Sequence, residues 1–317
     1  MKVIIQIPCF NEAATLPIAL AALPTELEGV ECVEVLIIND GSTDDTVRVA
    51  KQSGVHHVVG FTRNQGLAKA FMLGLRSSVA LGADIIVNTD ADNQYCADDI
   101  EALIKPILEG RADMVIGARP ISAIEHFSMA KKLLQRLGSW FVRTMSKTDV
   151  VDAPSGFRAI TRDAACTLNV FNNYTYTLET IIQAGQKNLQ IVSVPVRVNG
   201  DLRPSRLVRS IPAYIRKSIV TVLRIIVVYR PFRFFALVGS LFFVAGLAVG
   251  VRFLYFYLEN GGNGRIQSLI LAGVLLMMGV QIGMMGFIAD LLSVNRRLLE
   301  DLEARERSRS QKKTREL

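Results

Sequence analysis

The sequence predicts an α/β chain with a doubly wound, mostly parallel sheet, followed by interfacial helices and a two-helix transmembrane hairpin. Through residues 1–200, short apolar stretches alternate with amphipathic ones, which is typical of strands and helices in a parallel sheet. Charged residues follow several apolar stretches, at the strand ends where such sheets bind ligands. Residues 234–292 are dominated by apolar residues, as expected of membrane spans.

We expect strands and helices to alternate from the first residues onward. The apolar stretches predict strands at 3–7, 32–38, 55–60, 85–89, 114–117 and 189–198, and the amphipathic stretches predict helices at 13–22, 44–52, 64–81, 97–108, 163–168 and 176–186. Ser42 or Thr43 is expected to cap the helix at 44–52. An amphipathic stretch at 127–147 fits a core-facing helix and a membrane-surface helix equally well. A glycine-rich dinucleotide fingerprint is absent after the first strand, which disfavours a hydride-transfer enzyme.

Five charged residues follow the predicted strands of the sheet, namely Glu12, Asp40, Asp90, Asp92 and Arg119. Right-handed crossovers bring the carboxyl ends of these strands to one edge, so the five side chains should converge there. Asp90 and Asp92 provide hard oxygen ligands of the kind that bind Mg²⁺ or Mn²⁺. An isolated Asp-x-Asp is more often a surface turn, but the convergence favours a metal–diphosphate site.

The C-terminal third predicts a membrane hairpin with both ends in the cytosol. Residues 234–251, extended through 258, and 266–292 are each long enough to cross a bilayer. Arg230, Arg233, Arg296 and Arg297 flank the hairpin, whereas the intervening turn has only Arg265, with Arg252 nearby. Small residues on both spans permit close helix packing and make a homo-oligomer plausible. We therefore expect four parts: a cytosolic catalytic domain (1–206), amphipathic juxtamembrane helices (207–232), two spans (233–293) and a charged cytosolic tail (294–317).

The composition limits the partners of the chain. The 317 residues carry a formal net charge of +7, and their mean hydropathy is +0.31. The basic residues crowd 197–233 and the tail, which indicates a membrane surface rather than nucleic acid. The four cysteines have no metal-binding spacing and are expected to be reduced. The three histidines receive no catalytic role.

With these motifs assembled, the sequence resembles the family 2 glycosyltransferases, and among them the polyprenyl-phosphate glycosyltransferases similar to dolichyl-phosphate mannose synthase. The resemblance covers nearly the whole chain and implies a GT-A-like sheet. It is carried by Pro8-Cys9-Phe10-Asn11-Glu12, by Asn39-Asp40-Gly41-Ser42, where Asn39 replaces the usual first aspartate, and by Asp90-Ala91-Asp92-Asn93-Gln94. Arg119, Ser155-Gly156-Phe157-Arg158 and Arg203-Pro204-Ser205-Arg206 match further family positions. The last motif lacks the usual glycine and has Arg206 in place of lysine, which leaves the sugar open.

The resemblance implies a role for each matching residue. Asp92, Asp90 and Arg203 would be catalytic, and Asp90, Asp92 and Gln94 would surround the metal. The nucleotide sugar would contact Pro8, Phe10, Glu12, Asp40, Asp90, Ala91, Asp92, Gln94 and Arg119. The acceptor phosphate would contact Arg119, Ser155, Arg158, Arg203, Ser205 and Arg206. Asp152 would orient a substrate or cap the turn that follows it.

The predicted reaction is inverting transfer of a sugar from a nucleotide-diphospho-sugar to a membrane polyprenyl phosphate, undecaprenyl or dolichyl phosphate, on the cytosolic face of a bacterial or archaeal plasma membrane. A phosphate monoester has a second pKa of about 6, so this nucleophile needs little help from a general base. Two alternatives stay open: a membrane glycosyltransferase that uses a lipid hydroxyl or a polysaccharide, and an inactive membrane scaffold. A transporter is disfavoured because two spans without an internal ion pair make a poor transport path.

Overall fold

The computed structural model describes residues 1–120, 143, 146, 148–170, 176–200, 220, 223–224, 226–260 and 266–315. The chain divides into two compact units, residues 1–209 with 304–317 and residues 210–303. The predicted helix at 127–147 and most of the predicted juxtamembrane segment lie outside the described residues. The four-part division expected from the sequence therefore stays a prediction.

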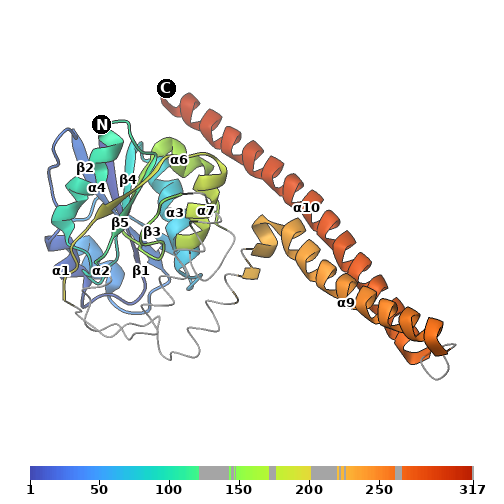
Figure 1. Ribbon diagram of the computed structural model, residues 1–317. Helices are drawn as coiled ribbons and strands as arrows, with labels where there is room; N and C mark the ends of the chain where they lie inside the picture. The colour runs from blue at the N-terminus through green and yellow to red at the C-terminus, as the bar shows by residue number, and fades with distance from the viewer. Residues whose placement is uncertain are drawn as a thin grey trace. The chain divides into compact units, whose positions relative to one another are not determined.

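The first unit has a seven-stranded sheet in the order β3-β2-β1-β4-β6-β5-β7 (Figure 1). Its strands are β1 (Lys2–Cys9), β2 (Cys32–Asp40), β3 (His57–Phe61), β4 (Ile85–Asn88), β5 (Met114–Ala118), β6 (Arg158–Thr161) and β7 (Ile191–Pro195). The pairs of β1 with β2 and β4, of β2 with β3 and of β5 with β7 are parallel. β6 is antiparallel to both β4 and β5. The predicted mostly parallel sheet is confirmed, and β6 is its antiparallel member.

The helices of this unit are short and connect successive strands. They are α1 (Leu16–Ala21), α2 (Thr46–Gln52), α3 (Leu67–Ala80), a 3-10 turn (Ala97–Asp99) that leads into α4 (Ile100–Leu108), α6 (Arg162–Thr167) and α7 (Thr177–Gln186). The predicted cap of α2 is wrong, because neither Ser42 nor Thr43 bonds its first turn. The Asp44 carboxylate accepts the Thr46 N–H instead (3.0 Å).

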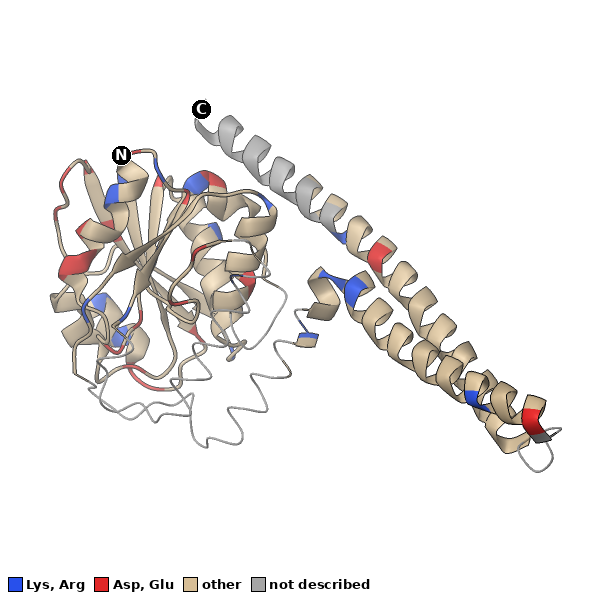
Figure 2. Ribbon diagram, in the orientation of Figure 1, with Lys and Arg blue, Asp and Glu red and all other residues tan. Residues whose placement is uncertain are grey.

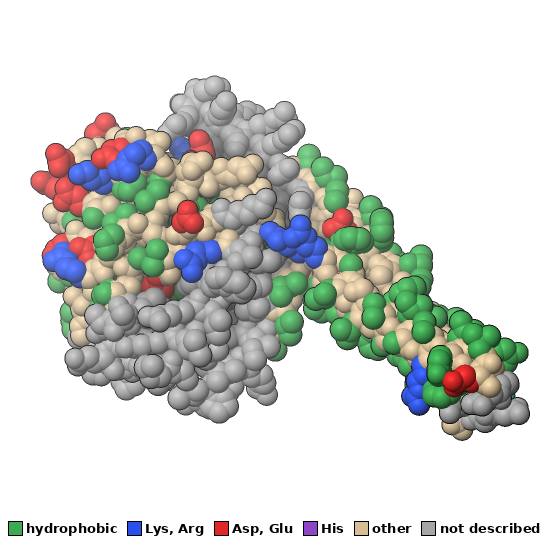
Figure 3. All heavy atoms as spheres, viewed as in Figure 1, with side chains coloured by type: hydrophobic (Ala, Val, Ile, Leu, Met, Phe, Trp, Pro, Cys, Tyr) green, Lys and Arg blue, Asp and Glu red, His purple; other side chains and the backbone are tan. Residues whose placement is uncertain are grey.

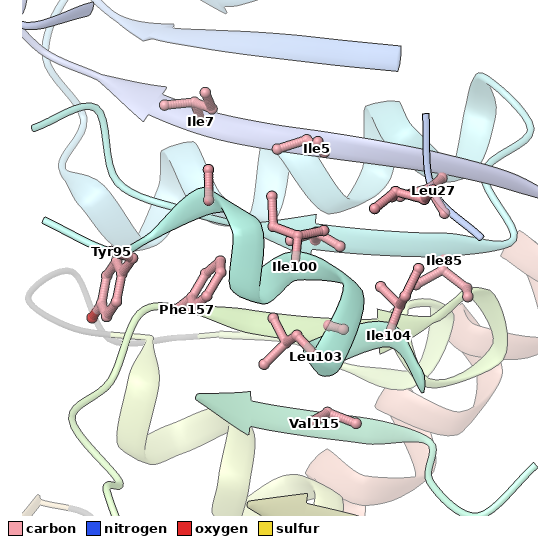
Figure 4. Packing of buried hydrophobic residues seen from close by; sticks show 14 of the residues in the cluster. Ile5, Ile7, Leu27, Ile85, Tyr95, Ile100, Leu103, Ile104, Val115 and Phe157 are labelled. Carbon is pink, nitrogen blue, oxygen red and sulfur yellow. The ribbon is translucent and has the colours of Figure 1, made fainter. Parts of the chain in front are cut away.

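Helices cover both faces of the sheet. On one face α4 packs Ile100, Leu103 and Ile104 against alternate residues of the strands, including Ile5 and Ile7 of β1 (Figure 4). On the other face lie α3 and α7, and there Gly74 of α3 approaches so closely that an added Cβ would lie 2.5 Å from the Gln6 side chain. This face also buries apolar strand residues such as Ile4, Ile38 and Ile86, so its polar side chains stand among apolar ones.

The second unit contains the long helix α9 (Pro231–Asn260) and most of the long helix α10 (Ile266–Arg315). Residues Pro231–Glu259 and Ile266–Arg296 are long and apolar enough to cross a membrane, with mean hydropathies of 2.4 and 2.0. Only 11% and 17% of their most apolar windows are buried. Figure 3 shows hydrophobic side chains along the visible face of both helices, and Figure 2 shows charges mainly towards their ends. An apolar exterior of this kind fits a lipid solvent better than water.

Glycines set the contact between α9 and α10. A Cβ added at Gly239 would lie 2.7 Å from the Gly279 carbonyl oxygen, and one added at Gly279 would lie 2.8 Å from the Gly239 oxygen. Gly286 meets Phe235 in the same way (3.0 Å). The two backbones touch where neither helix has a side chain, as is common between membrane helices.

This contact predicts that Gly239→Ala destabilises the hairpin by about 1–3 kcal/mol, because the methyl group meets backbone that cannot move aside. The thermal midpoint of the full chain in detergent measures the loss. Gly273→Ala is the matched control, since a Cβ added at Gly273 meets nothing within 4 Å. Equal midpoints for the two variants would contradict the predicted packing.

Candidate functional site

Two loops join at the carboxyl ends of β1 and β2. Asn11 has a positive φ of 56°, its N–H donates to the Ser42 hydroxyl (3.0 Å), and its side-chain oxygen accepts the Thr43 N–H (2.8 Å). The Glu12 N–H donates to the Thr46 hydroxyl (2.9 Å). Pro8–Glu12 and Asn39–Thr46 therefore form one continuous rim of the sheet.

On this rim the predicted nucleotide-site residues differ in exposure. Phe10 is 39% exposed, and an exposed aromatic ring is a suitable surface for a flat ligand. Glu12 is buried, and its carboxylate accepts the Thr15 hydroxyl (2.8 Å). Pro8 lies at the end of β1. The structure brings these residues together at the expected edge, and their contacts with a nucleotide stay a prediction.

Asp40 has a structural task in addition to its predicted one. It is buried, and its two oxygens accept the N–H groups of Gln65 (2.7 Å) and Gly66 (2.9 Å) at the start of α3. Gly41 follows with a φ of 69°, and a Cβ there would lie 2.3 Å from the Arg63 backbone, so only glycine fits. Contact of Asp40 with a base or ribose would have to use its remaining lone pairs.

Asp90 and Asp92 flank the buried Ala91 directly after β4. Asp92 accepts the Gln94 N–H (3.3 Å), and Asn93 turns the loop with a φ of 53°. The segment after β7 braces this loop: the Asn199 N–H donates to the Gln94 carbonyl oxygen (2.9 Å) and its amide donates to that of Asn93 (3.0 Å). The acidic loop is thus a supported turn, although most of its length lacks regular secondary structure.

Gly156 lies close to Asp90, and both its N–H and its carbonyl oxygen are hydrogen-bonded. Its N–H donates to the Tyr95 hydroxyl (3.0 Å), and its carbonyl accepts from Asn88 (2.8 Å). A Cβ added at Gly156 would lie 3.3 Å from both Asp90 oxygens and 3.0 Å from the Tyr176 hydroxyl oxygen. We call these contacts of Gly156 with Asn88, Asp90, Tyr95 and Tyr176 the Gly156 clamp. The clamp holds Gly156 beside the Asp90 carboxylate.

Arg119 pairs with Asp152 at the mouth of β5. Its guanidinium donates to both Asp152 oxygens (2.7 and 3.1 Å), and Asp152 is fully buried. The side chain of Arg119 is 12% exposed. A phosphate would therefore meet an arginine already oriented by a carboxylate. The Asp152 carboxylate holds Arg119, and its backbone carbonyl accepts the Ser155 N–H in the turn that follows (3.2 Å). Its role in orienting a substrate stays a prediction.

The structure does not favour Arg158 and Ser155 as phosphate ligands. Both are fully buried. The Arg158 guanidinium donates to the carbonyls of Ser155 (2.8 Å) and Ala153 (2.9 Å) and to the Thr180 hydroxyl (2.6 Å). Burial lowers the pKa of Arg158 to about 10, which still leaves the group charged at neutral pH. Through these hydrogen bonds Arg158 stabilises the 153–155 loop from inside the protein.

The remaining acceptor residues, Arg203, Ser205 and Arg206, lie outside the described residues. Within the described part of the chain, no group of three His, Cys, Asp or Glu residues is placed to hold a metal ion. The acidic loop therefore offers two carboxylates and the Gln94 amide. Sequence reasoning missed Asn88, Tyr95, Tyr176 and Asn199. The sequence could have pointed to Asn88, because it is a polar residue at the end of an otherwise apolar strand.

A family model described as Glycosyl transferase family 2 matches residues 4–168. The chain is 28% identical over 207 residues to the undecaprenyl-phosphate mannosyltransferase of Micrococcus luteus, an alignment that covers 62% of this chain and 83% of that protein. It is 27% identical over 212 residues to the UDP-N-acetylglucosamine–dolichyl-phosphate N-acetylglucosaminyltransferase of Methanococcus voltae, covering 60% and 83%. The glycosyltransferase AglJ of Haloferax volcanii matches at 26% identity over 311 residues, 93% of this chain and 95% of that protein.

Among solved structures, glucosyl-3-phosphoglycerate synthase from Mycobacterium tuberculosis in complex with Mn²⁺, UDP and phosphoglyceric acid superposes with a TM-score of 0.53. The identity is 20%, and the match covers 70% of this chain and 78% of that chain. This similarity shows a shared fold. The expected GT-A-like α/β fold is confirmed, as is the resemblance to the polyprenyl-phosphate glycosyltransferases.

The Arg119–Asp152 pair predicts that Asp152→Ala destabilises the first unit by about 3–5 kcal/mol, because it leaves a largely buried guanidinium without its carboxylate. Chemical denaturation of the full chain, followed by circular dichroism, measures the effect. Asp98→Ala is the control: Asp98 pairs with Arg197 but is 77% exposed, so no measurable change is expected. A stable Asp152→Ala variant would show that the pair is not a structural anchor.

Proposed function

Because the chain belongs to glycosyl transferase family 2, we propose that it transfers a sugar from a nucleotide-diphospho-sugar to a membrane polyprenyl phosphate. One observation carries the proposal: Asp90 and Asp92 lie at the carboxyl end of β4, in a chain of this family that continues into two helices apolar enough to span a bilayer. The names of relatives that act on undecaprenyl phosphate and dolichyl phosphate support the acceptor class.

The acidic loop fits a divalent cation. Asp90, Asp92 and Gln94 provide hard oxygen donors, and they are too few to complete an octahedral shell. Mg²⁺ characteristically binds through one or two carboxylates together with substrate phosphates, and the open positions suit a diphosphate. Mg²⁺ or Mn²⁺ bound there would act as a Lewis acid that neutralises the leaving diphosphate. The Mn²⁺ and UDP in the mycobacterial structure support this class of cofactor.

Other side chains would bind the donor around this loop. Phe10 would stack on the base, and Glu12 and Asp40 line the same rim of the sheet. Arg119, oriented by Asp152, would donate charge-assisted hydrogen bonds to phosphate oxygens. Positive charge held near the leaving group in this way would stabilise the negative charge that develops on it.

The acceptor would be its own nucleophile. A polyprenyl phosphate is mostly dianionic at neutral pH, so its oxygen attacks without losing a proton to a protein base. Attack from the face opposite the diphosphate inverts the anomeric centre. Arg203, Ser205 and Arg206 are proposed to bind the acceptor phosphate. The relatives' names include both mannose and N-acetylglucosamine, so the proposal leaves the sugar open.

The two apolar helices would anchor the enzyme where its lipid substrate is found. The described flanks Arg230, Arg233 and Arg296 carry positive charge on the side from which the hairpin enters and leaves the bilayer. By the positive-inside bias, that side is the cytosol, where nucleotide sugars are available. The proposed location is a bacterial or archaeal plasma membrane.

The metal site predicts that Asp92→Ala abolishes formation of lipid-linked sugar while the protein still inserts into membranes, because a hard cation loses a carboxylate ligand. The assay incubates membranes with labelled nucleotide sugars and polyprenyl phosphate, extracts lipids and counts label in the organic phase. EDTA should stop the wild-type reaction, and added Mg²⁺ or Mn²⁺ should restore it.

Asp98→Ala removes an exposed carboxylate beyond the acidic loop and serves as the control, with activity expected to be retained. Full activity of Asp92→Ala, or turnover that persists in EDTA, would remove the metal-site proposal. Label that appears only in a polysaccharide or on a neutral lipid would favour the alternative acceptor.

The proposed orientation predicts which cysteines a membrane-impermeant maleimide reaches in intact cells. Cys32 is exposed in the first unit and should react only after the membrane is permeabilised. A cysteine introduced by Glu259→Cys, at the far end of the first candidate span, should react before permeabilisation. The wild-type chain gives the background labelling. Labelling of Cys32 in intact cells would show that the topology is the opposite of the one proposed.

A further inference from the structure

A row of three polar side chains crosses the sheet at the end of β4 that leads into the acidic loop. Gln6 on β1 pairs in register with Asn88 on β4, which pairs with Arg158 on β6. All three are fully buried. Their strand neighbours Ile5, Val87 and Ala159 point to the opposite face and belong to the apolar core. The row is therefore a polar layer in a sheet that is otherwise packed with apolar side chains.

This row is costly for the fold. The Gln6 side-chain oxygen is buried and has no hydrogen-bond partner in the described part of the chain. Buried polar groups that lack partners destabilise a protein, and apolar side chains of similar shape would avoid that cost. A polar row that stability does not require calls for a functional explanation.

The hydrogen bonds of the row lead towards Asp90. The Gln6 amide donates to the Asn88 side-chain oxygen (2.9 Å). The Asn88 amide then donates both to the Gly156 carbonyl (2.8 Å) and to the Tyr176 hydroxyl (2.9 Å). A Cβ added at Gly156 would lie 3.0 Å from the Tyr176 hydroxyl oxygen and 3.3 Å from both Asp90 oxygens, so Tyr176 and Asp90 lie on the same side of Gly156. The row thus leads to the surroundings of one of the two predicted metal ligands.

Tyr176 is fixed in this place by its ring. It stacks on Phe71 of α3, with centroids 3.8 Å apart and the planes 8° from parallel, and the Arg158 guanidinium lies 5.6 Å from its ring centre. Its hydroxyl accepts from the Asn88 amide (2.9 Å) and donates to the Gly156 carbonyl oxygen (3.4 Å). The ring and the hydroxyl therefore hold Tyr176 in a single orientation.

We propose that Tyr176 is a positioning residue for the metal site: through Asn88 and Gly156 it sets the Asp90 carboxylate in the orientation that binds the cation and the donor diphosphate. The inference rests on the proposed function, since it presumes that Asp90 and Asp92 hold a cation. Mutation of a group that orients a metal ligand commonly lowers metal affinity by about 10- to 100-fold.

The test measures Mn²⁺ binding to the purified full chain in detergent, with UDP and separately with GDP, from the electron paramagnetic resonance signal of free Mn²⁺. Tyr176→Phe keeps the stacked ring and removes the hydroxyl. We expect its dissociation constant for Mn²⁺ to rise by about tenfold. Tyr255→Phe makes the same chemical change at an exposed position on α9 and should leave Mn²⁺ binding unchanged.

Gln6→Met tests the row at its far end, without replacing a residue of the acidic loop or the clamp. It should weaken Mn²⁺ binding in the same direction, because it withdraws the amide that Asn88 accepts. The midpoint is measured beside it, since the variant removes an oxygen that lacks a partner but also leaves the Asn88 oxygen without its donor. A purely structural row would instead change the midpoint and leave Mn²⁺ affinity unaltered. If Tyr176→Phe does not fold, Gln6→Met alone decides between these results.

Unchanged Mn²⁺ affinity in the folded variants, beside clear binding by the wild type, would overturn the positioning role and leave the proposed function in place. Failure of the wild type to bind Mn²⁺ with either nucleotide would remove the metal site itself and the positioning role with it.

Discussion

The candidate site depends on the fit between the Asp90 carboxylate and the bare Cα of Gly156. A carboxylate at the end of a strand would normally sample several rotamers in water. Here both Asp90 oxygens lie 3.3 Å from the position that a Cβ of Gly156 would take, with the Tyr176 hydroxyl close by. Gly156 is itself hydrogen-bonded to Asn88 at the end of β4 and to Tyr95 in the loop that follows β4. Segments far apart in the sequence thus meet around one acidic side chain.

The same region balances charge with little help from solvent. Arg158 is a buried cation that donates to two carbonyls and a hydroxyl, and Arg119 is a nearly buried cation paired with a buried carboxylate. Such groups cost free energy when they are desolvated. They lie beside the acidic loop, where a diphosphate with its cation would bring further charge. A preorganised polar environment of this kind is what stabilises a charged leaving group.

Much of the architecture could be predicted from the sequence, because it depends on local patterns. The apolar runs gave the strands, and the parallel rule placed Glu12, Asp40, Asp90 and Asp92 at one edge. The two apolar helices followed from length and composition. The antiparallel place of β6 could not be predicted, since a four-residue strand carries no signal of its direction.

The roles of the arginines were harder to predict, for a physical reason. A charged residue in a family motif looks the same in the sequence whether it faces a phosphate or holds a loop. Arg158 proved to be buried because Thr180, twenty-two positions later, and two nearby carbonyls enclose it. Tyr176 was missed because its partner Asn88 is eighty-eight positions away.

The central claim is that Asp90 and Asp92 hold a cation against a diphosphate. An experimental structure of the full chain with Mn²⁺ and UDP or GDP tests it most directly. The account predicts Mn²⁺ coordinated by oxygens of Asp92, Asp90 and the diphosphate, whereas a nucleotide bound with its phosphates away from the acidic loop would contradict it.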